Sequence, residues 1–289
     1  MSDAPIRPLE EARHLLDEIC QQADSTLQQR LTELDRLLAA AQRSGEGEDA
    51  EGLRQRMEEL IVTNAQFMSV MVHEIRVPMT SIRGYSDMLS KHVVGELNDM
   101  QQQFVDTIHA NVLRMEHLVS DISDISKLKA GRMHLEPKTE LYRDVALQVE
   151  KDAEELAAAH RHTLAFETPS DLPLLKVDGV RLAQALKKLV VNALQYTPDG
   201  GQITVRAEGI DGRVKVSVID SGVGMTEEER THVGEPFWRA DNEHVRSFRG
   251  HGLGLPIAIG FIELMGGEFF FESAAGKGST FGFIVPSAS

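Results

Sequence analysis

A pair of long helices is the feature of this sequence that most constrains its fold. From Leu53 to Leu89, and again from about Met100 to Lys129, apolar residues recur every three or four positions, which is the spacing of a helix with one buried face. The segment between them, from His92 to Asp99, contains Gly95 and ends the first helix. The sequence therefore predicts an all-α hairpin over residues 50–130.

The second helix carries an apolar stripe that is too wide for one partner helix to cover. The stripe consists of Phe104, Val105, Ile108, Val112, Met115, Leu118, Val119, Ile122, Ile125 and Leu128. One antiparallel hairpin leaves much of it exposed, whereas two hairpins from two chains bury it as a four-helix bundle. We therefore expect a homodimer.

The first helix is expected to present a histidine to solvent. Its apolar face runs through Phe67, Met71, Ile75, Ile82, Tyr85 and Leu89. His73 lies off this face, Glu74 follows it, and Pro78 is expected to bend the helix. An exposed imidazole with an acidic neighbour suits a phosphorylated residue. His109 and His117, on the second helix, lack this context, and we interpret them as surface histidines.

Residues 1–49 are expected to form an N-terminal coiled coil that receives an input signal. Leu27, Leu31, Leu34, Leu38 and Ala41 step by four and three, which is the spacing of a heptad core. The stretch fits either an amphipathic helix that packs on its own chain or a parallel two-stranded coil. We favour the coil because the stretch is long and no adjacent partner helix is evident. A sensor or adaptor protein is the partner expected there.

The composition argues against several classes of protein. The formal net charge of −15 disfavours general attraction to nucleic acid or anionic lipid. The single cysteine, Cys20, allows no intrachain disulfide, which suits a reducing compartment. The sequence has no apolar run long enough to span a membrane. We therefore expect a cytoplasmic protein that binds no nucleic acid and has no membrane span of its own.

A linker at residues 131–139 leads to a second domain at residues 140–289, where helices and strands are mixed. We expect helices over about 141–160, 180–196 and after Gly254, and strands over 163–167, 174–177, 202–208, 213–219, 268–272 and 279–285. Strands beside helices in this order predict an α/β sandwich, in which helices cover one face of a single sheet.

Two clusters in this second domain have the chemistry of a nucleotide site. Asn192 lies on a helix that is apolar on most sides, so its amide is either a satisfied core group or a ligand for Mg²⁺. Asp220 ends a strand and precedes Gly222 and Gly224. A carboxylate there accepts a hydrogen bond from an adenine amino group, and the glycines let the backbone approach the ring.

Two further clusters follow along the chain. The segment from Glu235 to Ala240 is either a hydrophobic anchor or the seat of a lid that supplies Arg239 to a phosphate. The sequence GHGLGL then enters a helix, so that Gly252, Leu253 and Gly254 offer backbone donors to an anion. One glycine-rich loop is weak evidence. Packing alone does not readily explain all four clusters in this order.

These motifs resemble those of a sensor histidine kinase of the two-component type, over roughly residues 50–286. HEIRVP around His73 resembles the phospho-acceptor box of that family. VVNALQYTP, DSGVGM, EPFWRADN and GHGLGL resemble its asparagine box, first glycine box, phenylalanine box and second glycine box. The resemblance implies a dimerisation and phosphotransfer bundle, followed by an ATP-binding domain of the kind shared with gyrase and Hsp90.

The resemblance also implies the cofactors and the reaction. It gives ATP and Mg²⁺ as cofactors, Asn192 as the Mg²⁺ ligand, Asp220 as the adenine reader and Tyr196 as an adenine-stacking residue. The implied reaction is autophosphorylation of His73, with Glu74 orienting the imidazole, followed by transfer to an aspartate of a response-regulator receiver domain. Two alternatives stay open. One is a degenerate kinase that acts as a dimeric signalling scaffold, and the other is a related protein serine kinase or ATPase.

Three departures from the family pattern bear on activity. Lys188 stands where a second asparagine is usual, and its ammonium cannot ligate magnesium. Gln195 replaces a usual lysine, which removes a phosphate contact. Val77, four residues after the histidine, replaces the Thr or Asn that positions water for dephosphorylation of the partner, and we therefore predict weak phosphatase activity.

Overall fold

The computed structural model describes residues 50–240, residue 245 and residues 250–288. The expected coiled coil over residues 1–49 lies outside the described residues. The described residues from Ile61 onward belong to one compact unit. Within the described part of the chain, no helix is both long and apolar enough to cross a membrane.

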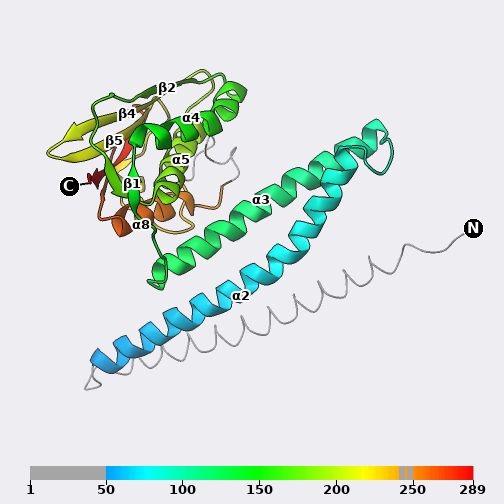
Figure 1. Cartoon of the computed structure of the whole chain (residues 1–289), viewed down its shortest axis with the longest axis horizontal. Helices are drawn as coiled ribbons and strands as arrows, with labels where there is room; N and C mark the ends of the chain where they lie inside the picture. The colour runs from blue at the N-terminus through cyan, green and yellow to red at the C-terminus, as the bar shows by residue number, and fades with distance from the viewer. Residues whose placement is uncertain (1–49, 241–244, 246–249, 289) are drawn as a thin grey trace, which may run out of the picture. The chain divides into compact units, whose positions relative to one another are not determined.

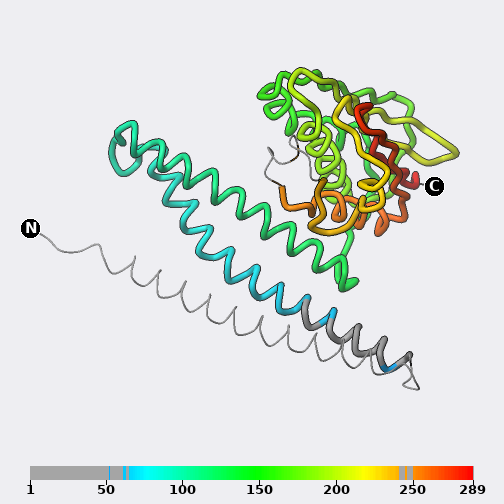
Figure 2. Tube along the Cα trace, turned by 180° about the vertical axis from the view of Figure 1, so that it is seen from behind, coloured from blue at the N-terminus to red at the C-terminus, as the bar shows by residue number. Residues whose placement is uncertain are grey.

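The predicted helical hairpin is confirmed. Helix α2 (Ala50–Ser90) continues through Pro78, and helix α3 (Asp99–Lys129) follows a short turn (Figures 1 and 2). The turn contains His92 and Gly95, both with positive φ. α3 begins at a capping box, in which the Asn98 side chain accepts from the Gln101 amide and the Gln101 side chain accepts from the Asn98 amide. Local sequence thus sets where the hairpin reverses.

The buried face of α2 differs by about one position from the predicted face. Val72 and Met79 pack with Val112 and Val119 of α3 to form the small hairpin core, with Ile75 beside them. The prediction that Ile82 and Tyr85 belong to the buried face is wrong for this hairpin, because their side chains are 44% and 69% exposed. A partner helix that crosses at an angle selects its own line of contacts, and sequence spacing alone does not fix that line.

The wide stripe on α3 is covered within this chain over only part of its length. Its C-terminal part, comprising Leu118, Ile122, Ile125 and Leu128, packs against the core of the second domain of the same chain. Its N-terminal part retains exposed Phe104, Ile108 and Met115. The C-terminal part of the stripe therefore does not need a second hairpin to cover it, in contrast to the prediction, whereas the N-terminal part is left uncovered as predicted.

The second domain is the predicted α/β sandwich. Its main sheet has five strands in the order β2-β4-β5-β7-β6. They are β2 (Thr163–Glu167), β4 (Gln202–Ile210), β5 (Arg213–Asp220), β7 (Ser279–Pro286) and β6 (Glu268–Ser273). β2 runs parallel to β4, and the other neighbours are antiparallel. The positive φ of Asp211 and Gly212 makes the tight β4–β5 turn.

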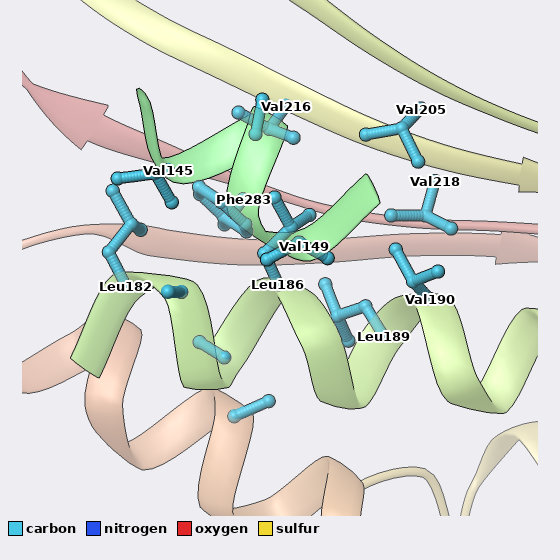
Figure 3. Packing of buried hydrophobic residues seen from close by; sticks show 14 of the residues in the cluster. Val145, Val149, Leu182, Leu186, Leu189, Val190, Val205, Val216, Val218 and Phe283 are labelled. Atoms are coloured by element: carbon cyan, nitrogen blue, oxygen red, sulfur yellow. The ribbon is translucent and has the colours of Figure 1, made fainter. Parts of the chain in front are cut away.

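Three helices supply the apolar surface that buries this sheet. They are α4 (Tyr142–Ala159), α5 (Gly179–Tyr196) and α8 (Gly254–Leu264). Figure 3 shows Leu182, Leu186 and Val190 of α5 directed toward Val216 and Val218 of the sheet. Alternate residues of β5, Val214, Val216 and Val218, are buried, as a strand with one core-facing side requires. The stacked layers hold the ends of α5 and β5 at fixed positions.

Two short elements were not predicted. β1 (Lys138–Glu140) pairs antiparallel with β3 (Leu175–Val177), and it lies partly in the expected linker. α6 (Glu227–Arg230) is a single turn that begins at a capping box of Thr226 and Glu229. Both are too short and too polar to show a hydrophobic period.

Candidate functional site

His73 lies on the exposed side of α2, as its spacing predicted. Its side chain and that of Glu74 are both exposed, while the neighbouring Val72 is in the hairpin core. Val70 and Val77 flank His73 along the helix and are 60% and 56% exposed. Two large apolar side chains in water beside an accessible imidazole make this stretch a candidate docking surface for another protein.

Asn192 and Tyr196 lie in the last two turns of α5. The helix is fixed by buried Leu186, Leu189 and Leu194, and both site residues are half-buried beside this apolar face. A methyl group added to Gly254, the first residue of α8, would lie 3.9 Å from Oδ1 of Asn192. The amide oxygen of Asn192 therefore faces the beginning of α8, where the sequence predicts bound phosphates.

Asp220 is the last residue of β5, and it is almost completely buried. Its Oδ1 accepts hydrogen bonds from the Gly222 amide at 2.8 Å and from the Ser279 amide at 3.1 Å. Burial raises the pKa of Asp220 to about 6, because desolvation outweighs the two backbone donors, which act to lower it. A buried carboxylate held on one oxygen by backbone amides has its second oxygen available for a ligand.

The glycines after Asp220 are required by close contacts within the protein. A side chain on Gly222 would overlap the carbonyl oxygen of Tyr196, and a side chain on Gly224 would overlap that of Ala274. Gly224 also has a φ of 61°, which disfavours other residues. These glycines let the loop pass between α5 and the β6–β7 hairpin. From the sequence alone, that freedom was expected to serve the approach of an adenine ring.

The second glycine loop is braced by the segment before it. The Phe237 amide donates to the Gly252 carbonyl at 3.0 Å, and a side chain on Gly252 would come within 2.7 Å of Trp238 O. Arg239 donates to the carbonyl oxygens of Gly250 at 3.0 Å and Val245 at 2.7 Å. Its guanidinium therefore supports the loop backbone. That it also reaches a phosphate stays a prediction.

Leu253 contributes to the site only through its backbone. Its side chain is 1% exposed and belongs to the core of the domain, and it precedes the first residue of α8. The amides at the start of α8 have no partner in the preceding turn of helix, so this end of the helix favours an anion. The position of the loop is consistent with the predicted phosphate site.

A cavity of about 580 Å³ opens at the end of the sheet beside Asp220. Its lining includes Asp220, Gly278, Ser279, Lys277 and Arg230, but not Asn192 or Gly254. Tyr196, Gly222 and Gly224 are also absent from the lining, so this cavity touches Asp220 but does not outline the predicted nucleotide site. The candidate site is therefore defined by Asp220 at one end and by the approach of Asn192 to α8 at the other.

The donor set around Asn192 fits a weakly held Mg²⁺ better than a metal held by the protein alone. Among residues 50–240, 245 and 250–288, no three His, Cys, Asp or Glu side chains are grouped to bind a metal ion. Magnesium in nucleotide sites commonly takes one or two protein oxygens together with phosphates and water. The single amide oxygen of Asn192 is suited to that arrangement.

Two contacts of the site were not predicted from the sequence. Ser279 donates to Asp220 because β5 and β7 pair with these two residues opposite each other. Lys188 Nζ lies 2.7 Å from Asp121 Oδ1 on α3. The first contact is set by the pairing of two strands and the second by the packing of α3 on the domain. Neither can be read from the residues of a local motif.

Two family models match the chain over these regions. The His Kinase A (phospho-acceptor) domain matches residues 63–131, which include His73. The histidine kinase-, DNA gyrase B- and HSP90-like ATPase family matches residues 177–289, which include Asn192, Asp220 and both glycine loops. The two matches cover the helical hairpin and most of the α/β domain.

Curated relatives align with more than three quarters of this chain. Histidine protein kinase DivJ of Caulobacter vibrioides is 36% identical over 235 residues, which are 79% of this chain and 38% of DivJ. Sensor protein DivL of the same organism is 33% identical over 220 residues, which are 76% of this chain and 28% of DivL. The chain thus spans well under half the length of these relatives.

Solved structures agree with the fold. Full-length ShkA in complex with AMPPNP matches with a TM-score of 0.67 at 27% identity, covering 78% of this chain and 46% of ShkA. Histidine kinase ThkA in complex with the response regulator protein TrrA matches with a TM-score of 0.54 at 27% identity, covering 82% of this chain and 66% of that one. With both family models matched in this order and these relatives aligned across both regions, the chain belongs to the sensor histidine kinase family.

Proposed function

We propose that this chain is a protein histidine kinase that uses ATP to phosphorylate His73 and passes the phosphoryl group to an aspartate of a response-regulator receiver domain. The observation that carries the proposal is the combination, on one chain, of an exposed His73 on a phospho-acceptor hairpin and a glycine-lined site around buried Asp220. A serine kinase of the same ATPase family has no need of such a hairpin.

The nucleotide site is assigned from its two ends. The free oxygen of Asp220 accepts from the adenine amino group, and Tyr196 lies one turn beyond Asn192 on the same helix, in position to border the ring. The amides of Gly252, Leu253 and Gly254 receive the phosphates at the start of α8. Asn192 offers its oxygen to Mg²⁺, which when bound neutralises charge on the phosphates. ShkA, solved with AMPPNP, supports a nucleotide triphosphate as the ligand.

His73 is the phosphoryl acceptor. A histidine imidazole can act as a nucleophile, and the exposure of His73 lets a second domain approach it. Glu74 orients the imidazole by accepting a hydrogen bond from the N–H of one ring nitrogen, so that the other nitrogen attacks the γ-phosphorus of ATP and ADP leaves. Phosphoryl transfer requires alignment and charge neutralisation more than covalent participation of the protein.

The receiver domain docks beside His73. Val70 and Val77 supply exposed apolar surface on the same stretch of α2. ThkA, solved with the response regulator protein TrrA, supports a partner of this class. Val77 offers no hydrogen bond with which to position a water molecule, so the chain is a weak phosphatase toward its partner.

The chain forms a homodimer through its helical hairpin. Ile82 and Tyr85 of α2 and Phe104, Ile108 and Met115 of α3 remain exposed, and large apolar side chains grouped in this way favour a partner. A second hairpin of the same chain forms the four-helix bundle that buries them.

Incubation with γ-labelled ATP tests the proposed function. The wild-type chain should acquire label that is lost in acid, as expected for phosphohistidine. His73→Gln should acquire none, whereas His117→Gln, an exposed histidine on α3, should label normally. The scaffold alternative predicts no label on any of the three, and the serine-kinase alternative predicts acid-stable label that survives in His73→Gln.

A further inference from the structure

Helix α3 contacts the ATP-binding domain through two ion pairs. Lys188 Nζ of α5 lies 2.7 Å from Asp121 Oδ1, and Arg181, two turns earlier on α5, lies 3.7 Å from Asp124. Beside them Leu128 packs so closely on α8 that a side chain on Gly260 would come within 2.8 Å of its Cδ1. The contact between α3 and the domain therefore combines two ion pairs with apolar packing.

Both ion pairs are partly shielded from water. The side chains of Lys188 and Asp121 are 20% and 27% exposed, and that of Asp124 is 12% exposed. Burial raises the pKa of Asp124, while Arg181 acts to lower it. Ion pairs shielded in this way interact more strongly than pairs in open solvent. The two pairs therefore contribute to holding α3 against the domain, and part of that contribution is lost if either cation leaves.

Lys188 shares a face of α5 with Asn192, the residue proposed to approach the phosphates, because it precedes Asn192 by four residues. Asn192 faces Gly254 at the start of α8, and Arg181 lies over the ring of Phe261 further along α8 at 5.2 Å. Along α5, Lys188 therefore lies between the residue that faces the start of α8 and the residue that contacts Phe261, and its four-carbon side chain is flexible.

We propose that Lys188 forms a releasable latch with Asp121, and that the phosphates of a bound nucleotide open this latch by taking Lys188 from Asp121. The inference rests on the proposed nucleotide site. One ammonium group has two alternative anionic partners, the carboxylate of Asp121 and the phosphates at the glycine loop. In the latched state the domain is held on α3. In the opened state this restraint is removed, and the domain leaves α3 more readily to bring the nucleotide to His73.

The latch links nucleotide binding to the contact with α3 in both directions. Because the partners compete for one cation, binding of phosphate weakens the Lys188–Asp121 pair, and loss of Asp121 strengthens phosphate binding by the same factor. Adenosine, which carries no phosphate, should occupy the Asp220 end of the site and leave the latch closed. The comparison of ADP with adenosine therefore isolates the proposed step.

Carbodiimide coupling tests the latch directly. The reagent joins a lysine amine to a carboxylate in an ion pair as an amide, and mass spectrometry locates the linked peptides. Lys187, the neighbour of Lys188, pairs with Asp152 of α4 at the same distance of 2.7 Å and serves as an internal control. ADP should reduce the Lys188–Asp121 product severalfold and leave the Lys187–Asp152 product unchanged. Adenosine should change neither. An equal Lys188–Asp121 yield with and without saturating ADP overturns the proposal.

Binding measurements separate the latch from the proposed function. Asp121→Asn should bind ADP about fivefold to tenfold more tightly than the wild type and bind adenosine equally, whereas Asp152→Asn should match the wild type for both. The gain should vanish when Lys188→Gln is added to Asp121→Asn. A wild-type chain that binds no ADP overturns the proposed nucleotide site itself. Tight ADP binding that Asp121→Asn does not change overturns the latch alone.

Discussion

The carbonyl oxygen of Tyr196 accepts a hydrogen bond from the amide of Val223 at 3.1 Å. This bond joins the last residue of α5 to the loop that follows Asp220. On its other side the same loop is tied to the β6–β7 hairpin, because the Gly276 amide donates to Val223 O at 2.7 Å. The helix that carries Asn192 and the strand that carries Asp220 are therefore held in register by backbone contacts that leave no space for side chains.

Replacement of Gly222 by alanine should separate these two elements. The added methyl group would overlap the Tyr196 carbonyl, so the loop must move away from α5. We expect a loss of about 1–3 kcal/mol in the free energy of unfolding, which is typical of overpacking, together with weaker ADP binding. Denaturant unfolding and calorimetric titration measure the two effects.

Gly84→Ala is the matched control for this substitution. Gly84 lies within α2, and nothing lies within 4 Å of an added methyl group. Alanine there should leave ADP binding unchanged and stabilise the helix slightly. If Gly222→Ala and Gly84→Ala had the same free energy of unfolding and the same ADP affinity, the loop beside Tyr196 would have room for a side chain.

The motifs themselves could be predicted from sequence, whereas the contacts that brace them could not. The alternation of apolar residues stops at Asp220, which predicts a strand end there, and the pattern predicts the strand at Thr163–Glu167 with its observed bounds. Ser279 became a partner of Asp220 only through the pairing of β5 with β7. β1 exists because it pairs with β3, and its three residues carry no apolar period of their own. Features set by nearby residues could therefore be predicted, whereas features set by the pairing of distant strands could not.

The stability of the nucleotide-free protein should depend on the ionisation of Asp220. Burial raises the pKa of this carboxyl to about 6 in the folded chain, from an ordinary value of 3.8. A raised pKa means that the folded state binds the proton more tightly, so this stabilisation is fully present below about pH 4. It is lost as the pH rises through 6. The loss amounts to about 3 kcal/mol.

Asp220→Asn should remove this pH dependence because an amide does not titrate. Its carbonyl oxygen retains the hydrogen bonds from Gly222 and Ser279. At pH 8 the variant should therefore be more stable than the wild type in the absence of nucleotide. Unfolding measured in denaturant between pH 4 and pH 8 tests this. Parallel pH profiles for the two proteins would contradict the assignment.

Nucleotide affinity should show the opposite dependence on pH. The charged form of Asp220 is the better acceptor for an adenine amino group, so adenosine should bind more tightly as the pH rises through 6. Adenosine is the appropriate ligand because it has no phosphates to titrate. In Asp220→Asn the affinity should be low and independent of pH. A wild-type affinity that stays flat from pH 5 to pH 7.5 would place the adenine elsewhere.

Arg239→Lys should loosen the second glycine loop. The guanidinium donates at once to Gly250 O and Val245 O, and a lysine ammonium does not reproduce this planar two-point geometry. Amide hydrogen exchange over residues 250–254 should therefore accelerate, and ADP affinity should fall about tenfold. Arg213→Lys, at a half-exposed pair with Glu268, is the control and should change neither quantity. Unchanged exchange in Arg239→Lys would show that the bracing contacts are dispensable.

Phe104→Glu should dissociate the proposed dimer. Phe104 is 61% exposed on the uncovered part of the α3 stripe, and a carboxylate buried there in a bundle would have no partner. We expect the dissociation constant, measured by sedimentation, to rise at least about a hundredfold. Gln103→Glu adds the same charge at the adjacent exposed position, off the stripe, and should leave the association unchanged. Equal behaviour of the two variants would exclude this face from the interface.

Val77→Thr should convert the chain into a more active phosphatase toward its receiver partner. Val77 lies one turn after His73, is 56% exposed, and has the same branched shape as threonine. The substitution therefore replaces one methyl group by a hydroxyl that can hold a water molecule near the phosphorylated aspartate. Helix α2 should tolerate it, because Thr80 already donates its hydroxyl to Arg76 O on the same helix.

Release of phosphate from a purified phosphorylated receiver should rise severalfold above the wild-type rate. Val62→Thr introduces the same hydroxyl about three turns before His73, at a site that is 37% exposed and outside the proposed docking surface, and should leave the rate unchanged. Rapid release by the wild-type chain, or an equal gain in both variants, would show that the residue after His73 does not limit this activity.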